Sequence, residues 1–168
     1  MPNTFELIAS SAVGSGGASS ITFSSIPSTF TDLCIKFSAR DNSSFIANNI
    51  DLSFNGSTAS FSVRSLYGNG TSALSITQSN AAGLAAAANA TANTFGNSEF
   101  YIPNYAGSTN KSYSGDSVSE NNATEAYDWF YAGLRSNTAA ITSITITAGS
   151  SATFQNHSNF YLYGVKNA

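Results

Sequence analysis

Few side chains of this 168-residue chain could perform chemistry. The chain has one histidine, His157, within a polar run, and one cysteine, Cys34, within an alternating apolar run. A zinc site needs several His or Cys ligands at short spacing, and neither residue has such neighbours in the sequence. We therefore expect His157 in a solvated loop and Cys34 as a small packing residue, with no metal or cofactor site.

The acidic residues give little sign of catalysis. The nine Asp and Glu residues are spread along the chain without a D-x-D pair or an acidic cluster. Glycoside hydrolysis needs two carboxylates, which could still converge in space. The nucleophile elbow of a serine hydrolase, G-x-S-x-G, does not occur. The sequence predicts a non-enzymatic protein without catalytic residues, and a carbohydrate-active enzyme is the distant alternative.

The side chains with binding potential are three aromatic residues at alternate positions. Tyr127, Trp129 and Tyr131 lie on one face of a strand predicted at 126–135. Exposed aromatic rings stack on sugars and anchor protein interfaces. The same face could instead be the second buried side of a central strand. Core, subunit interface and glycan platform are the three interpretations of this stripe.

Charge and hydropathy argue against two classes of partner. The net charge is -3, only 9% of residues are charged, and the six Lys and Arg residues form no run. Phosphate binding needs clustered cations, so no nucleic-acid partner is expected. No segment approaches the roughly 20 apolar residues of a membrane span, so no membrane partner is expected either. The first residues do not resemble a secretory signal, which favours assembly in a cytoplasm.

The elements that position these residues follow a period of two. The clearest stretch is 50–63, where Ile50, Leu52 and Phe54 alternate with polar residues before the turn dipeptide at 55–56. This pattern predicts a β-hairpin, the central pair of a sheet, flanked by strands at 33–40 and 126–135. Further strands are predicted at 4–10, 21–24, 73–77, 98–102, 111–119, 141–147 and 159–165.

The number and spacing of these strands predict the fold class. About eight to ten short strands at intervals of about 10–12 residues are typical of a sandwich or jelly roll. We expect an all-β, antiparallel β-sandwich, jelly-roll-like, as a single domain over 1–168, in which 1–19 could form an N-terminal arm. The Ala-rich segment 81–90 has high helix propensity and predicts at most one or two short helical turns, or else a closely packed loop.

Several segments, in order along most of the chain, share a further likeness. They are SITFSSIPSTFTDL at 20–33, LSFNG at 52–56, YIPNYAGS at 101–108 with Lys111, NTAAITSI at 137–144 and YLYGVK at 161–166. Together they resemble small β-rich virion structural proteins of tailed bacteriophages, particularly phages of marine and cyanobacterial hosts. These segments mark strands and turns and contain no catalytic centre.

The resemblance implies a non-enzymatic structural protein of the virion, on the capsid surface or the tail, assembled in the host cytoplasm. The chain lacks the long shaft of a tail fibre, which favours a capsid decoration (cement) protein. Such a protein contacts the major capsid protein or other virion proteins and self-associates, a homotrimer being favoured. The alternative is a tail-fibre or tail-tip module that recognises a host surface polysaccharide, with Tyr127, Trp129 or Tyr131 stacking on the glycan.

Overall fold

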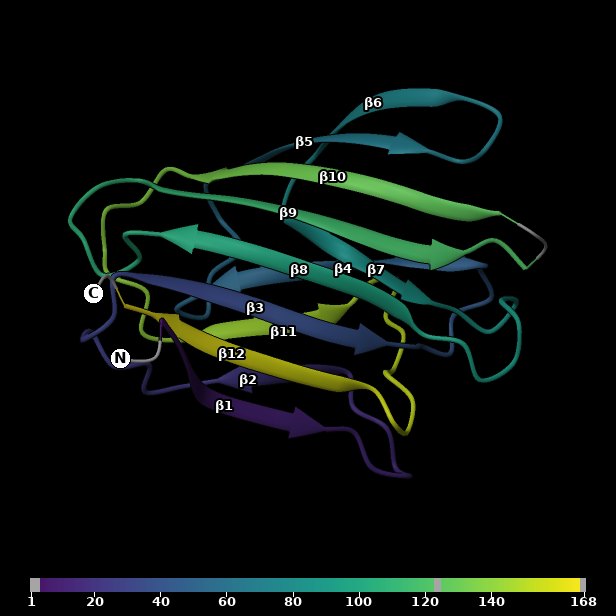
Figure 1. Cartoon of the computed structure of the whole chain (residues 1–168), viewed down its shortest axis with the longest axis horizontal. Helices are drawn as coiled ribbons and strands as arrows, with labels where there is room; N and C mark the ends of the chain where they lie inside the picture. Colours follow the sequence, from purple (N-terminus) through teal and green to yellow (C-terminus); the bar gives the residue numbers. More distant parts are fainter. Residues whose placement is uncertain (1–3, 123–124, 167–168) are drawn as a thin grey trace.

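The computed structural model describes residues 4–122 and 125–166, which form twelve β-strands and no helix (Figure 1). The strands are β1 (Phe5–Ala12), β2 (Ser20–Phe23), β3 (Asp32–Ala39), β4 (Ala47–Phe54), β5 (Phe61–Gly68), β6 (Ala73–Gln78), β7 (Ala81–Ala86), β8 (Gly96–Pro103), β9 (Lys111–Glu120), β10 (Ala126–Arg135), β11 (Ile144–Ala148) and β12 (Asn159–Val165). In this part of the chain, no helix is long and apolar enough to cross a membrane.

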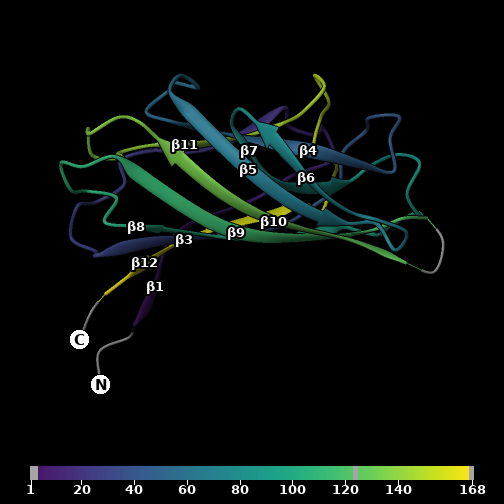
Figure 2. The same cartoon turned by 90° about the horizontal axis from the view of Figure 1, so that it is seen from above.

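The strands form two antiparallel sheets packed as layers (Figure 2). The large sheet has the order β1-β12-β3-β8-β9-β10-β5-β6, and the small sheet has the order β2-β11-β4-β7. When β5, β6, β9 and β10 are set aside, β1-β12-β3-β8 faces β2-β11-β4-β7. The chain therefore winds early and late strands alternately into both sheets, which is the topology of a jelly roll. The predicted jelly-roll-like β-sandwich is confirmed.

The four remaining strands extend the large sheet beyond the jelly roll. β9 pairs with β8, β10 with β9, β5 with β10, and β6 forms the outer edge. At the opposite edge β1 pairs with β12, so residues 5–12 of the segment considered as an N-terminal arm belong to the sheet. Residues 1–3 of that segment lie outside the described residues. Because the small sheet has only four strands, it covers only part of the large one.

The core lies between the sheets and follows the predicted alternation. In β3, Leu33, Ile35 and Phe37 are buried on the face toward the small sheet. In β4 of the small sheet, the side chains of Ile50 and Leu52 are buried on the face toward the large sheet. Burial of such alternating apolar side chains is the main favourable term in folding a sandwich.

The predicted hairpin at 50–63 is wrong in its pairing. Asn55 and Gly56 do form a tight turn, with φ of 53° and 71°. However, β4 pairs with β11 and β7 in the small sheet, while β5 pairs with β10 and β6 in the large sheet. The side chain of Asn55 explains the difference, because its Oδ1 accepts hydrogen bonds from the backbone N–H groups of Thr142 and Ser143. These bonds hold the turn against the segment that leads into β11.

The segment 81–90 contains neither the helical turns that were predicted as its upper limit nor, over 81–86, the packed loop that was the alternative. Residues 81–86 are strand β7, buried along its whole length and paired with β4. The alanines allow β7 to lie close under β8 and β9, and the backbone of Leu84 approaches Gly96 so closely that a Cβ there would meet its carbonyl oxygen at 2.6 Å. Tertiary burial of small side chains thus outweighs a helix propensity that is a weak preference over so short a segment.

Candidate functional site

A cleft of about 420 Å³ opens between the small sheet and the extension of the large sheet. One wall comes from β4, β7 and the loops beside them, and the other comes from β5 and β10. The lining residues are Phe45, Ala47, Asn48, Asn49, Leu84 and Ser150 on the first wall, and Tyr67, Asn69, Tyr127 and Trp129 on the second. All of these side chains are aromatic, aliphatic, amide or hydroxyl groups, so the lining is uncharged.

The large-sheet wall carries a stack of aromatic rings. Alternation in β10 places Tyr127, Trp129 and Tyr131 on the face toward the small sheet. Trp129 lies directly opposite Tyr67 of β5, and the two rings stack with centroids 4.4 Å apart and planes at 9°. Tyr131 extends the stack along β10, with its centroid 5.8 Å from that of Trp129. The rings therefore hold one another in a fixed arrangement.

The structure divides the predicted stripe between two environments. Tyr127 and Trp129 are half-buried and line the cleft. Tyr131 is only 3% exposed and packs against Phe100 in the core, where burial raises the pKa of its phenol. The core interpretation thus describes Tyr131, while Tyr127 and Trp129 remain accessible to a ligand.

The small-sheet wall carries two side-chain amides, of which one is hydrogen-bonded to other described residues and the other is not. Asn48 is buried, and its Nδ2 donates to Asp41 Oδ2 at 2.6 Å and to the carbonyl of Gly149 at 2.9 Å. Its Oδ1 accepts a bond from the hydroxyl of Ser150 at 3.2 Å. The neighbouring Asn49 is exposed, and within the described part of the chain its side-chain amide forms no hydrogen bond. Asn48 thus fixes the wall, and Asn49 can bind a ligand.

A third amide lies across the cleft at the end of β5. Asn69 Oδ1 accepts hydrogen bonds from the backbone N–H groups of Thr71 and Ser72. These bonds fix the plane of the amide and leave its NH₂ group as a donor. Donors and acceptors of this kind, set among aromatic rings, are typical of small-molecule sites.

Sequence reasoning missed most of this site and identified only Tyr127 and Trp129 among its lining residues. Tyr67, Phe45, Asn49 and Asn69 were not singled out, because each comes from a segment without a distinctive motif. The position of Tyr67 depends on the pairing of β5 with β10. The sequence predicts that the strand at 126–135 flanks the two strands of 50–63, but it does not predict which residues lie opposite one another. No local signal in the sequence gives the register that stacks Tyr67 on Trp129.

A second hollow, of about 390 Å³, adjoins the cleft through Tyr67. Its lining is largely apolar and consists of Leu66, Tyr67, Gly68, Ala73, Leu74, Ser75 and Phe130. Phe130 lies opposite Leu66 on the outer face of the large sheet, and the two are 56% and 60% exposed. This hollow lies beside the edge strand β6.

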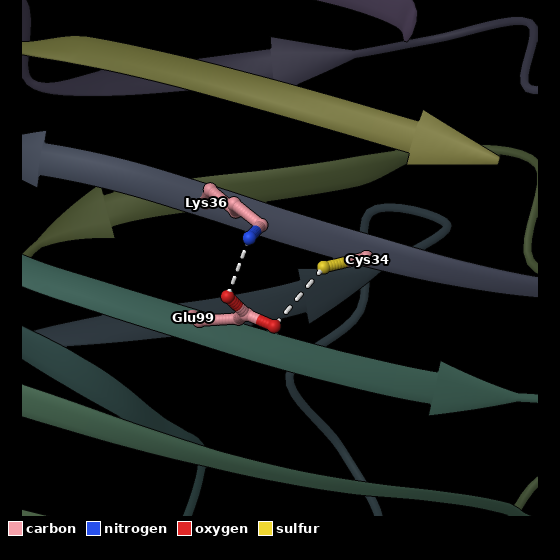
Figure 3. A network of polar contacts seen from close by, with 3 residues as sticks. All are labelled: Cys34, Lys36 and Glu99. Carbon is pink, nitrogen blue, oxygen red and sulfur yellow. Dashed lines mark hydrogen bonds and ion pairs between the residues drawn. The ribbon is translucent and has the colours of Figure 1, made fainter. Parts of the chain in front are cut away.

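The outer face of the large sheet also holds a small polar network (Figure 3). Lys36 Nζ lies 2.7 Å from Glu99 Oε2, and the Cys34 thiol donates to Glu99 Oε1 at 3.7 Å. Burial, and secondly the negative charge of Glu99, raise the pKa of Cys34 to about 11. A protonated, buried thiol is a poor nucleophile, so Cys34 is a packing residue as expected.

Two cations, Lys111 of β9 and Arg135 of β10, are buried at the end of these strands away from Trp129. Lys111 donates from Nζ to the carbonyl oxygens of Gly107 and Thr138, at 2.6 and 3.3 Å. The Arg135 guanidinium, opposite Lys111 in the register, lies 5.7 Å from the centroid of the Phe61 ring. Burial lowers the pKa of both groups. These residues hold loops and rings in place at the end of the sandwich away from Trp129.

The remaining candidates from the sequence do not converge. His157 is exposed in the turn before β12, as expected. Among residues 4–122 and 125–166, no group of three or more His, Cys, Asp and Glu side chains could hold a metal ion. Comparisons of the chain with protein-family models, curated proteins and solved structures find no match. The resemblance to virion proteins therefore stays a prediction.

Proposed function

We propose that this protein is a non-enzymatic carbohydrate-binding jelly roll that holds a neutral saccharide in the cleft beside Trp129. One observation carries the proposal: the ordered Tyr67–Trp129 stack lies beside the exposed side-chain amide of Asn49 and the NH₂ group of Asn69, whose Oδ1 is held by its own turn. Because the rings already hold one another, a ligand does not have to order them, and this lowers the entropic cost of binding.

The lining matches the two kinds of surface that a sugar presents. The C–H groups of a pyranose are apolar and pack against aromatic rings such as Trp129, Tyr127 and Phe45. Sugar hydroxyls both donate and accept hydrogen bonds, and a side-chain amide does the same. The uncharged lining favours a neutral saccharide, since a carboxylate or phosphate would lose its hydration without gaining a cationic partner.

The cleft also bears on the virion role that the sequence resemblance implies. The resemblance implies either a capsid decoration protein or a receptor-binding module of the tail. Of these two roles, we propose the receptor-binding module, which recognises a surface polysaccharide. A capsid decoration protein needs a face that docks on other virion proteins, and the exposed Phe130 and Leu66 on the outer face are the nearest candidates for it. The cleft offers a more specific chemistry than that face, because it combines aromatic rings with hydrogen-bonding amide groups.

A glycan array tests the proposal with matched variants. The wild-type protein should bind neutral oligosaccharides in preference to sialylated, uronic-acid or phosphorylated ones. Trp129→Ala should weaken this binding by about tenfold or more, since an aromatic contact is worth about 0.5–1.5 kcal/mol beyond the area it buries. Asn49→Ala removes an exposed amide without breaking a described hydrogen bond, so it should weaken binding while the fold stays intact.

Phe130→Ala is the matched control, because Phe130 is an exposed aromatic residue on the same strand but on the opposite face. It should leave glycan binding unchanged. A protein that binds no neutral glycan, or that binds one equally well after Trp129→Ala and Asn49→Ala, would overturn the proposal.

A further inference from the structure

Three of the four sheet edges carry a device that prevents further strand pairing. The edge strand β2 has only four residues, and β7 is buried along its whole length. In β1 the register shifts between Leu7 and Ala9, and Glu6 forms an ion pair with Lys166 at 2.8 Å. Short strands, covered strands, bulges and charges are the usual means by which proteins protect sheet edges.

The fourth edge, β6, carries no such device. Its sequence ALSITQ contains neither a charge nor a proline, its pairing with β5 runs without a shift, and most of its residues are exposed. Figure 1 shows β6 at the outer edge of the sheet, beside β5. One long side of its backbone therefore faces solvent with unpaired N–H and C=O groups. Such an edge is a template for another strand, and the apolar hollow lined by Leu74 and Phe130 continues beside it.

We propose that β6 pairs with β6 of a second copy of this chain, antiparallel and about a two-fold axis at Ser75. This register sets Ser75 against Ser75, and Leu74 of each copy against Ile76 of the other. Cross-strand apolar pairs of this kind stabilise a sheet. The two eight-stranded sheets would then continue across the dimer as one surface.

The charges around β6 favour a second copy as the occupant. Arg64 lies opposite Thr77, near the C-terminal end of β6. The carboxylate of Glu125 lies against Gly70 in the turn that precedes β6, so the N-terminal end is negative. Antiparallel pairing brings the Arg64 end of one copy to the Glu125 end of the other. A strand without charge of its own adds no repulsion at the two-fold axis, although the chain carries a net charge of -3.

Disulfide trapping tests this register. In an antiparallel pair, opposed Cα atoms lie about 4.5–5.5 Å apart, which is within the range that a disulfide spans. Ser75→Cys should therefore form a covalent dimer under mild oxidation, and the native Cys34 should not react because it is fully buried. Ser114→Cys, at an exposed position on β9 away from the edge, is the control and should stay monomeric on a non-reducing gel.

Analytical ultracentrifugation over a wide concentration series supplies the second measurement. The wild type should show a concentration-dependent dimer. Ser75→Lys sets two like charges against each other at the two-fold axis and should shift the dimer to monomer. Its unfolding midpoint should match that of the wild type at concentrations where both are monomeric. A wild-type monomer at all concentrations, a trimer, or crosslinking of Ser114→Cys as efficient as that of Ser75→Cys would each overturn the proposal. Glycan binding by the Ser75→Lys monomer would leave the proposed function standing, so the two proposals fail separately.

Discussion

At the scale of single residues, Gly83 excludes a side chain both by its backbone conformation and by overlap with its neighbours. Its φ is 113°, and a Cβ there would lie 2.7 Å from Phe37 Cζ and 2.8 Å from Ser98 Oγ. Gly56 also has a positive φ, of 71°, but its Cβ would meet nothing within 4 Å. The two glycines therefore separate the cost of backbone conformation from the cost of overlap.

We predict that Gly83→Ala destabilises the fold by about 3 kcal/mol or more, because strain and overpacking add. Gly56→Ala, the control, should cost only about 1–2 kcal/mol from the left-handed backbone. Chemical denaturation measures both free energies of unfolding. Equal losses in the two variants would show that β7 does not pack as tightly as described.

Cys34 gives a prediction about alkaline pH. Its folded pKa is about 11, above the ordinary value, so the unfolded chain releases the thiol proton first as the pH rises. The stability from this group is fully present below about pH 9 and is lost as the pH rises toward 11, a change of about 2–3 kcal/mol. Unfolding free energies measured across this range should fall more steeply for the wild type than for Cys34→Ala.

The Cys34→Ala comparison is needed because burial also raises the pKa of Tyr113 and Tyr131, whose titration adds its own dependence on pH. Only the difference between wild type and variant reports on the thiol. Parallel curves for the two proteins would contradict the burial of Cys34 beside Glu99.

At the scale of the element, β7 is held by its surroundings and not by its own propensity. We predict that Ala85→Leu, which adds volume to a fully buried strand, costs about 1–3 kcal/mol. Ala88→Leu lies just beyond β7 at an exposed position and should change stability by less than about 0.5 kcal/mol. Thermal or denaturant unfolding distinguishes them, and a neutral Ala85→Leu would mean that the segment is loosely packed.

The elements also show what a sequence can and cannot predict. Alternation in 33–40 and 126–135 gives strands and their faces correctly, because the period of two is local. Pairing is different: Ile50 and Val63 have the pattern of a hairpin, yet they lie in different sheets. The partner of a strand depends on long-range packing, and here side-chain bonds of Asn55 to residues 142–143 help to select β11.

At the scale of the whole molecule, the cleft exists because the two sheets differ in width. The jelly roll alone would match four strands with four. The extension β9-β10-β5-β6 carries the large sheet past β7, so its inner face there is only partly covered. Trp129 and Tyr67 lie on that face, and the predicted stripe therefore runs from the core at Tyr131 out to the cleft at Tyr127.

The same geometry explains why the site was only partly predictable. The alternation of Tyr127, Trp129 and Tyr131 can be read from the sequence, but which of them is accessible depends on where the small sheet ends. The amides of Asn49 and Asn69 reach the cleft only through the crossing of the chain between sheets. Their role follows from topology, and no motif marks it.

Trp129 is the only tryptophan of the chain, so its fluorescence reports directly on the cleft. The most direct measurement is a titration of the wild-type protein with a neutral oligosaccharide, followed by Trp129 emission and by calorimetry on the same sample. The proposed function predicts a saturable change in emission with the same Kd as the calorimetric one, and loss of both signals when Asn49→Ala weakens binding. Binding heat without any change in Trp129 emission would place the glycan elsewhere, and no binding at all would contradict the proposed function itself.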